Sequence, residues 1–519
     1  MRFASSLPYR WIGSSLALLL LLGWLVTLPA KESTPILGTE PLPEGLVLVK
    51  PQIPIELVGS LKSINEQLSE ALSPADNAAN FLMIVFGPDA FEPELKEFTF
   101  ELLGLKKLPA NSPLFVSVDE FTRHAEGLTA EKRAERTGDI QEQLLIGGEA
   151  PWTRDEYPHL AEYLDANAEA LKMVAIASQK PRYYAPLLSI ENPSRLLSAD
   201  LTIERRLPFL ARMLVARSLL HLANNDFNRC ADDLVTCHKL ASLLAFGSPF
   251  DVSGAKAHVI DSYAFRAEAA CLDSGKLTGE QLQTFASRLR SLPPLPTADR
   301  AIDLGERAIV HQEIELLSTD TESVIGFFED ADSTAKGVPD LSKLNWKLAL
   351  AQADEIWDQI VLAVKTRNRA EQDKLFETLN QQYAAWEQSD EGSDPVRFQE
   401  LLKNKPDDAA RTVGRDMAYS LRPYWWQRRM TDDRAFVRRD LIHLGLAALL
   451  YRDEFQKFPD TLEELAPKFI ETIPAEPHSD GKYEYTRLAD GRVRILSTGP
   501  NRQNDANQDY NDDQFVDLK

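Results

Sequence analysis

An uncharged apolar run near the N-terminus constrains this 519-residue chain more than any other feature, because it determines the compartment in which the rest folds. The run extends from Trp11 to Ala30 between Arg10 and Lys31, and its length is just sufficient for one helix to cross a bilayer. Basic residues precede the run, so the positive-inside rule keeps residues 1–10 in the cytoplasm and exports the remainder of the chain.

Two fates of this apolar segment remain open. If the segment is retained, the protein is a single-pass protein of the inner (cytoplasmic) membrane, with its bulk on the extracytoplasmic side. If the segment is a cleaved signal peptide, the body is secreted, and small residues in an A-x-A pattern should end the run. Leu28 stands where the first alanine of that pattern belongs, which favours the retained anchor. Both fates place the body outside the cytoplasm.

The charge of the chain excludes one class of partner. Its 57 Lys and Arg residues and 79 Asp and Glu residues give a formal net charge of -22. This charge repels the phosphates of nucleic acids, so we expect no nucleic-acid binding. A hydrophobic content of 44% suits an ordinary apolar core, and three cysteines are too few for a disulfide-dense scaffold.

The periodicity of the apolar residues divides the chain into parts of different kinds. Prolines recur up to Pro54, which indicates an extended spacer, whereas a 3.6-residue period dominates from Leu57 onward and indicates helices. Near the C-terminus the period changes to two, which indicates strands. We therefore predict a mainly α fold in five parts: a cytoplasmic tip (1–10), a transmembrane helix or signal segment (11–30), a Pro-rich spacer (31–54), an irregular antiparallel helical body (55–430) and a small C-terminal α+β unit (431–519).

The centre of the body is predicted to consist of antiparallel helical hairpins. Helices are expected at about 203–223, 226–246 and 253–273, separated by two short turns. The first turn, followed by Ala231 and Leu234, resembles the turn and second helix of a tetratricopeptide repeat. A true array would recur with a period of about 34 residues, which the sequence does not show. We therefore expect an irregular layer that is only partly tetratricopeptide-like.

The same hairpins predict how the three cysteines are related. Cys230 and Cys271 are about equally distant from the turn near residue 250, so antiparallel packing brings them to one level, where a disulfide could form after export. Cys230 and Cys237 lie about 10 Å apart on one helix, at a rise of about 1.5 Å per residue, which excludes a bond between them. The alternative is that all three are small buried thiols.

No catalytic motif is found in the sequence. The chain lacks G-x-S-x-G, G-x-x-x-x-G-K-[ST] and G-x-G-x-x-G, and His311 is followed by Glu315 where a zinc-binding helix needs a second histidine. Paired acids such as Asp232-Asp233 and Asp432-Asp433 are expected to be surface charges, because adjacent helical carboxylates point apart. We therefore assign no catalytic and no cofactor-binding residue.

The C-terminal unit carries the signals of a β-hairpin. The segments Tyr483–Tyr485 and Arg492–Ile495 alternate in polarity around the turn residues Asp490-Gly491. Before them, Asp460 is predicted to cap a short helix that has Glu463 at its third position.

These segments, with Phe458-Pro459, Ser497-Thr-Gly-Pro500 and the Asp-rich tail, resemble the globular domain of type II secretion pseudopilins from about residue 435 onward. The glycine that this family has before its aromatic-Pro pair is replaced by Gln456-Lys457, and the Gly-ended leader of the family is not present. Processing as a pilin subunit is therefore not expected.

The whole layout is also similar to a group of uncharacterised bacterial membrane-anchored exported proteins. This resemblance extends to Pro151-Trp152 and to Pro181-Arg-Tyr-Tyr184, and it implies no known activity.

The acidic tail suggests a structural calcium ion. Calcium prefers six to eight oxygen ligands, and the tail offers oxygen side chains at short intervals. The pseudopilin resemblance also implies calcium in a C-terminal acidic loop. The predicted ligands are Asp505, Asn507, Asp509, Asp512 and Asp513. The alternative is a solvated acidic end that binds no ion.

These observations lead us to expect a membrane-tethered extracytoplasmic binding or scaffold protein rather than an enzyme. Its expected partners are other cell-envelope proteins, and the C-terminal resemblance connects it with a secretion system. The alternative is an extracytoplasmic hydrolase with a nonstandard site in the helical body. A deep pocket with carboxylates or histidines of perturbed pKa would favour the enzyme, and a shallow apolar groove would favour the binding protein.

Overall fold

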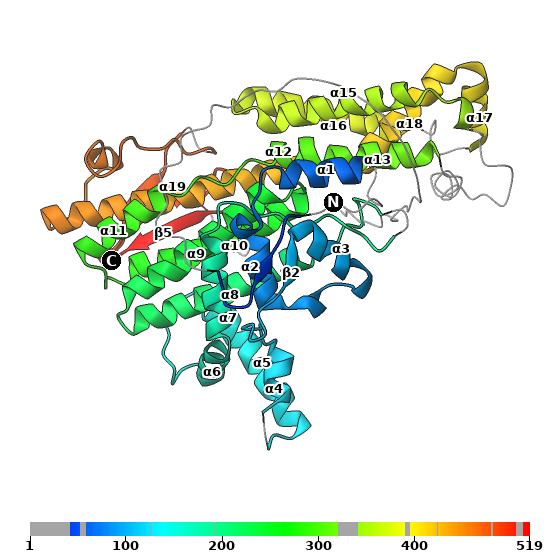
Figure 1. The fold of residues 1–519 in the computed structure, drawn as a ribbon. Helices are drawn as coiled ribbons and strands as arrows, with labels where there is room; N and C mark the ends of the chain where they lie inside the picture. The colour runs from blue at the N-terminus through cyan, green and yellow to red at the C-terminus, as the bar shows by residue number, and fades with distance from the viewer. Residues whose placement is uncertain are drawn as a thin grey trace.

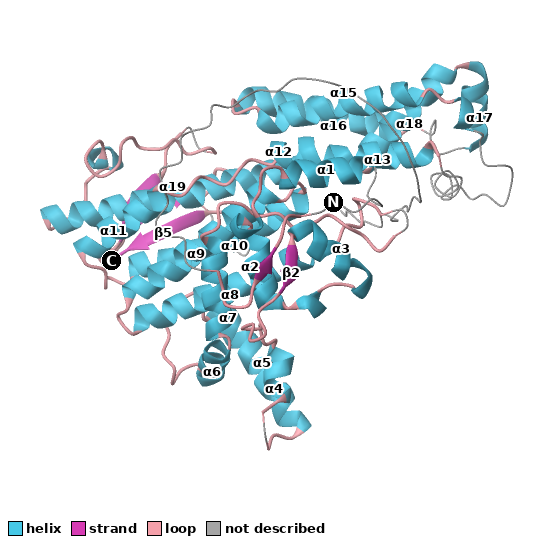
Figure 2. Cartoon of the chain, in the orientation of Figure 1, coloured by secondary structure: helices cyan, strands magenta, loops and turns pink. Residues whose placement is uncertain are grey.

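The computed structural model describes residues 42–51, 59–125, 127–191, 194–319, 341–389, 395–422, 424–478, 481–504 and 512–519. These residues form a mainly helical protein with a small amount of antiparallel sheet, as predicted (Figures 1 and 2). The predicted transmembrane segment 11–30 lies outside the described residues, as does most of the predicted spacer. None of the helices that are described is both long and apolar enough to cross a membrane.

The N-terminal part of the body is a group of short helices and one pair of short antiparallel strands. The elements are β1 (Val47–Leu48), α1 (Gly59–Ser69), α2 (Ala78–Phe86), α3 (Pro93–Leu103), β2 (Leu105–Lys107), α4 (Val118–Arg123), α5 (Ala130–Ile146), α6 (Pro158–Ala166) and α7 (Ala168–Ser178). Every side chain of α2 is buried, as expected for its apolar sequence. The Asn77 side chain caps α2 by accepting from Ala79 N at 3.1 Å, and it also donates to Tyr184 O at 2.9 Å. Tyr184 is itself buried, so this aromatic segment serves the core.

The centre consists of the predicted antiparallel helices. They are α8 (Thr202–Ala223), α9 (Phe227–Gly247), α10 (Asp251–Asp273) and α11 (Gly279–Arg290). Each of α8, α9 and α10 packs against the other two, and α11 packs on α9. The Sγ atoms of Cys230 and Cys271 lie 3.5 Å apart across α9 and α10, at one level as predicted, and both residues are buried thiols in this structure. Cys237 instead lies 3.6 Å from Ala211 O.

A second layer of helices has its own apolar core. Its members are α12 (Asp299–Ala301), a π-helical turn (Ile302–Glu306), α13 (Arg307–Leu317), α15 (Trp346–Lys365), α16 (Arg369–Glu387), α17 (Pro395–Asn404) and α18 (Pro406–Ser420). Trp357, Phe376 and Phe398 are the largest side chains buried among them. In Figure 1 this layer covers α1 and α19, and α13 contacts both α15 and α18.

The C-terminal unit is built on the longest helix described, α19 (Trp425–Phe455). It ends in a three-stranded antiparallel sheet with the order β3 (Glu484–Arg487), β4 (Val493–Ser497) and β5 (Gln514–Leu518). The hairpin of β3 and β4 turns at the predicted residues. The short helix before it is capped by Thr461 and Glu464, so the prediction of Asp460 and Glu463 was wrong by one residue. The Thr461 hydroxyl accepts from the backbone N–H of Glu464, whereas the backbone N–H of Asp460 donates to the Glu464 side chain.

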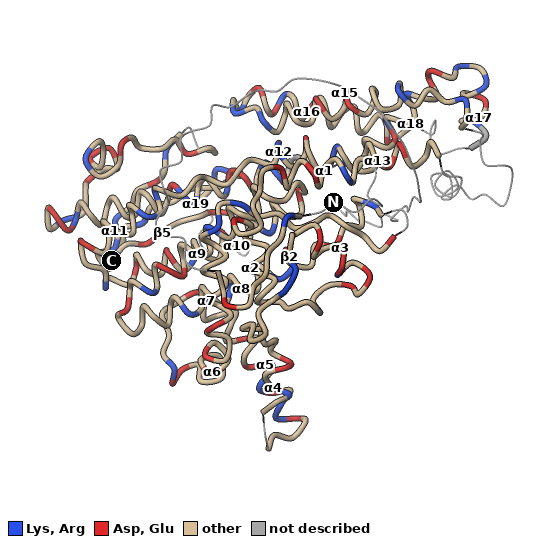
Figure 3. Tube along the Cα trace, viewed as in Figure 1, with Lys and Arg blue, Asp and Glu red and all other residues tan. Residues whose placement is uncertain are grey.

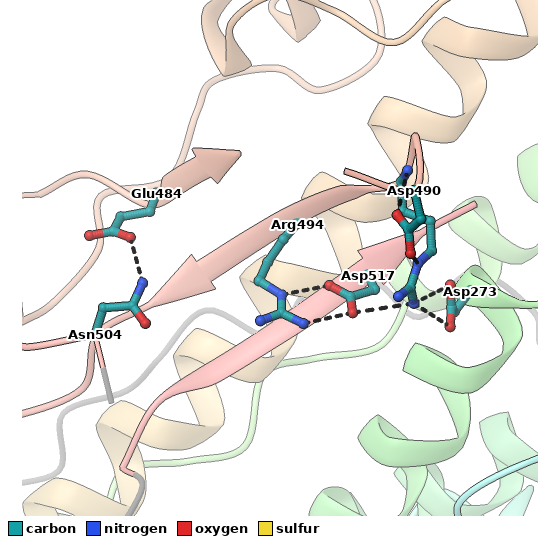
Figure 4. A network of polar contacts seen from close by, with 7 residues as sticks. Asp273, Glu484, Asp490, Arg494, Asn504 and Asp517 are labelled. Atoms are coloured by element: carbon teal, nitrogen blue, oxygen red, sulfur yellow. Dashed lines mark hydrogen bonds and ion pairs between the residues drawn. The ribbon is translucent and has the colours of Figure 1, made fainter. Parts of the chain in front are cut away.

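Ion pairs join this sheet to the helical body. The Arg492 guanidinium lies 3.1 Å from Asp273 at the end of α10, and it also contacts Asp490 and Asp517 (Figure 4). Arg494 holds Asp517 through two hydrogen bonds of 2.7 and 2.8 Å (Figure 4). The predicted boundary between the helical body and the C-terminal unit, at residues 430 and 431, falls inside α19. This helix packs on α10 and α11 as well as on β4 and β5.

The close packing of α18 on α15 predicts a stability difference. A Cβ atom at Gly414 would clash with the backbone carbonyl of Ala349, so Gly414→Ala should lower the free energy of unfolding by about 2 kcal/mol. At Gly138 in α5 no neighbour lies within 4 Å, so Gly138→Ala should raise it by about 0.5–1 kcal/mol. The free energies of unfolding of both variants, measured in denaturant, check this prediction. Equal effects of the two substitutions would contradict the close packing of α18 on α15.

Candidate functional site

Two helices place ionisable side chains where an apolar stripe would be expected. On α10 the residues His258, Asp261, Phe265 and Glu268 follow each other at intervals of three or four, so they lie on one face of the helix. On α19 the residues with the same spacing are Asp432, Ala435, Phe436, Arg439, Ile442 and His443. Because α10 packs on α19, the two polar faces meet.

A pocket lies where these faces meet. Its volume is about 60 Å³, which is room for a few water molecules or for a small chemical group. Apolar walls are supplied by Phe265, Phe436 and the segment that follows α11. The complete lining is His238, His258, Asp261, Phe265, Glu268, Leu289, Leu292, Pro293, Pro294, Leu295, Pro296, Asp432, Ala435, Phe436, Arg438, Arg439, Ile442 and His443.

His238 on α9 is held between two carboxylates of α10. Its Nδ1 lies 3.2 Å from Asp261 and its Nε2 lies 2.8 Å from Glu268. Burial opposes the charged imidazolium, but Glu268 and Asp261 outweigh it and raise the pKa of His238 to about 10. The second oxygen of Asp261 also lies 3.5 Å from Arg438 of α19. This part of the pocket is therefore an internally neutralised ion-pair network.

His258 contacts the other helix directly. Its Nε2 lies 3.2 Å from an oxygen of Asp432, but without the geometry of a hydrogen bond, and its Nδ1 is buried with no hydrogen-bond partner. The second oxygen of Asp432 accepts from Ala298 N at 3.0 Å. Nε2 of His258 thus lies next to a fixed carboxylate, and Nδ1 on the other side of the ring has no partner among the described residues.

The α11 side of the pocket has a different electrostatic character. Arg439 donates to Leu292 O at 2.9 Å, and no carboxylate of the described chain lies within 4 Å of its guanidinium. His443, one helical turn further on, has a pKa lowered to about 4 by burial and then by Arg439, Arg290 and His238. Each charged group that acts on His443 is a cation, so this side of the pocket is electropositive.

The paired acids had been expected to lie on the surface, and this prediction was wrong for three of the four residues. Asp432 and Asp433 are both buried, and Asp433 lies 2.9 Å from Arg429 and 3.1 Å from Arg369. Asp233 is buried against Arg217 at 2.7 Å, and only Asp232 is exposed. Adjacent carboxylates do point apart, but Asp433 meets Arg429 and Arg369 while Asp432 meets His258, so both members of this pair can lie inside.

The predicted calcium ligands are described only in part. Asp505, Asn507 and Asp509 lie outside the described residues. Asp512 accepts from Asn501 N at 3.1 Å with one carboxylate oxygen, and Asp513 follows it at the start of the last strand. Within the described ranges no group of three or more His, Cys, Asp or Glu residues has the arrangement of a metal site. The calcium site stays a prediction.

The sequence analysis did not assign the residues of the pocket. The available signal was the recurrence of ionisable residues within the helical period, for example Asp261 and Glu268 on α10 or Asp432 and Arg439 on α19. Such spacing places charges on one face of a helix. It does not reveal which face turns inward, and that depends on the neighbouring helices.

Comparison with known proteins returns no relative for this chain. No protein-family model matches it, and neither a curated protein nor a solved structure is significantly similar to it. The residues of the pocket are therefore assigned from their geometry alone.

The ion pair of His238 predicts a pH-dependent stability. The folded pKa of about 10 lies above the ordinary value of 6.5, so the stabilisation is complete below about pH 6.5 and is lost as the pH rises toward 10. Glu268→Gln should cost about 3 kcal/mol at pH 6.5, because it breaks a buried pair, and less as the pH approaches 10. Unfolding free energies at several pH values measure this, with the exposed Glu135→Gln as control. A cost that is independent of pH would contradict the assignment.

Proposed function

We propose that this protein is an extracytoplasmic binding protein, tethered to the inner membrane by residues 11–30, and that the pocket between α10 and α19 is its ligand site. The observation that carries the proposal is the composition of the pocket walls. Apolar side chains and the Pro293–Pro296 segment line the pocket together with a few charged groups, as is common in sites for small molecules.

The same walls favour binding over covalent catalysis. The lining residues include no Ser, Thr, Cys, Lys or Tyr, so the pocket offers none of the usual side-chain nucleophiles apart from its histidines and carboxylates. The carboxylates Asp261 and Glu268 are already engaged by His238. The pKa values of about 10 for His238 and about 4 for His443 both lie far from neutrality, where general acid–base catalysis works best.

The partners are proposed to be other components of the cell envelope, with a connection to a secretion system. This part of the proposal rests on the sequence resemblance of the C-terminal unit to pseudopilins. A ligand bound in the small pocket would then influence how the helical surface of this protein contacts those partners.

Filling the pocket tests the binding function. A thermal-shift screen of small molecules against the full-length protein in detergent should give ligands that stabilise it. Ala435→Leu places additional carbon atoms in the pocket and should weaken the affinity of these ligands by about tenfold or more. Ala134→Leu, at an exposed position of α5 that is not part of the pocket lining, is the control and should keep full affinity. Ligands that bind the Ala435→Leu variant unchanged would place the site elsewhere.

One observation favours the alternative, an extracytoplasmic hydrolase. A histidine held next to a carboxylate, with its other nitrogen unpartnered, can take a proton from water, and His258 with Asp432 has this arrangement. If the protein is a hydrolase, His258→Ala should lower turnover of chromogenic esters or phosphates by about a hundredfold, with the exposed His124→Ala as control. Absence of turnover above that of the heat-denatured protein would remove this alternative.

A further inference from the structure

Arg439 is a cation at the wall of the pocket, and among the residues that the structure describes no carboxylate lies within ion-pair distance of it. It is half-buried on α19, and one of its five N–H donors is used by Leu292 O. Burial lowers the pKa of Arg439, and Asp440 and Asp261 act on it only from beyond ion-pair distance. A partly buried guanidinium without a nearby carboxylate is unfavourable unless an anion joins it.

His443 extends this cationic wall. It follows Arg439 by four residues on α19, so the two side chains are neighbours on one helix face. The charged groups that face it are Arg439 on its own helix, Arg290 on α11 and His238 on α9, and all of them are positive. An anion placed between Arg439 and His443 would therefore meet one fixed cation and one imidazole that can take up a proton once a negative charge lies beside it.

The carboxylates of the pocket do not compete for this place. Asp261 is engaged by His238 and Arg438, Glu268 by His238, and Asp432 by His258 and Ala298 N. These contacts lie toward α9, along α10 from His258 to Glu268, and at the start of α19, and Asp261 acts on Arg439 only from beyond ion-pair distance. Arg439 and His443 face α11 and the apolar Pro293–Pro296 segment instead.

More arginines lie on the other side of the proline segment. A wider hollow of about 330 Å³ shares the walls Pro293–Pro296 and Phe436 with the pocket, and its charged lining residues are Arg300, Arg367 and Asp299. Neither arginine has a carboxylate of the described chain within ion-pair distance. Figure 3 shows basic residues recurring along α19 beside this region, although the whole chain is acidic.

We propose that the pocket binds a small carboxylate ligand, with Arg439 and His443 as the groups that hold its carboxylate and the Pro293–Pro296 segment as the wall for its apolar body. The inference rests on the pocket being the ligand site proposed above. Arginine suits this role because its fork of N–H donors matches a carboxylate in two parallel hydrogen bonds. The limited volume of the pocket restricts the ligand to a short apolar chain.

Binding of a carboxylate should change the protonation of His443. In the free pocket His443 is neutral, because burial and the surrounding cations keep its pKa at about 4. A bound carboxylate adds a negative charge beside the imidazole and raises that pKa. Binding should therefore take up protons, and the affinity should rise as the pH falls from 8 toward 5.5.

Calorimetry on the full-length protein in detergent tests the proposal. The probes are the straight-chain carboxylates from acetate to hexanoate and the matching neutral amides, at fixed ionic strength. Carboxylates should bind at least about tenfold more tightly than the amides, and Arg439→Gln should remove that difference. Arg434→Gln, on the same helix but outside the pocket lining, is the matched control and should keep it. Repeating the titration in buffers with different ionisation enthalpies measures the proton uptake, which His443→Gln should abolish.

The outcomes separate this proposal from the binding function itself. Amides that bind as well as carboxylates, or an Arg439→Gln variant that keeps the preference, would overturn the carboxylate assignment and leave the pocket as a site for neutral ligands. Absence of binding in both series would also overturn it, and the effect of Ala435→Leu on ligands from the screen would then decide the binding function independently. Melting temperatures show whether each variant is folded.

Discussion

The packing of α10 against α19 is the contact on which the rest of the structure depends, because it joins the helical body to the C-terminal unit. At one end the contact is apolar and very close. A Cβ atom at Gly445 of α19 would lie 2.8 Å from a methyl group of Leu272 and 3.2 Å from one of Leu518, so a larger residue would force the Leu272 side chain to shift. The sheet is fixed to the same end of α10 through Arg492 and Asp273. The C-terminal unit is therefore part of one core rather than an appended module.

The other end of the same contact is ionic. His258 and Asp432 are buried there and Asp261 is half-buried, and removing such groups from water costs several kcal/mol each before their attractions compensate. Replacing them with apolar residues would often be neutral or stabilising, so stability alone does not explain their presence. Within the described part of the chain this polar cluster leaves Arg439 without a counter-ion, which is the feature that the proposed ligand would supply.

The sequence predicted the helical class, the central hairpins and the C-terminal β-hairpin because these follow from local periodicity and turn residues. The spacing of Cys230 and Cys271 from the turn near residue 250 even predicted their contact, since antiparallel helices pair residues at equal distances from a turn. The pocket could not be predicted in this way. Its residues come from segments up to about 200 positions apart, and Asp432 had been expected at the surface because adjacent helical carboxylates point apart. Asp433 is acceptable there because Arg429 on the same helix and Arg369 on α16 neutralise it, and Asp432 because His258 and Ala298 N contact it.

The overall charge shapes what such a pocket can bind. A chain with a net charge of -22 repels small anions at long range, but ionic strength screens that repulsion beyond about 8 Å under physiological conditions. Recognition of an anion must then come from contacts within the pocket, where Arg439 and a protonatable His443 act over short distances in a region of low dielectric constant. Multiply charged anions meet more repulsion from the surrounding acidic surface than singly charged ones do. The balance of a repelling exterior and an attracting pocket therefore favours monocarboxylates, whose apolar part can contribute binding energy against the Pro293–Pro296 wall.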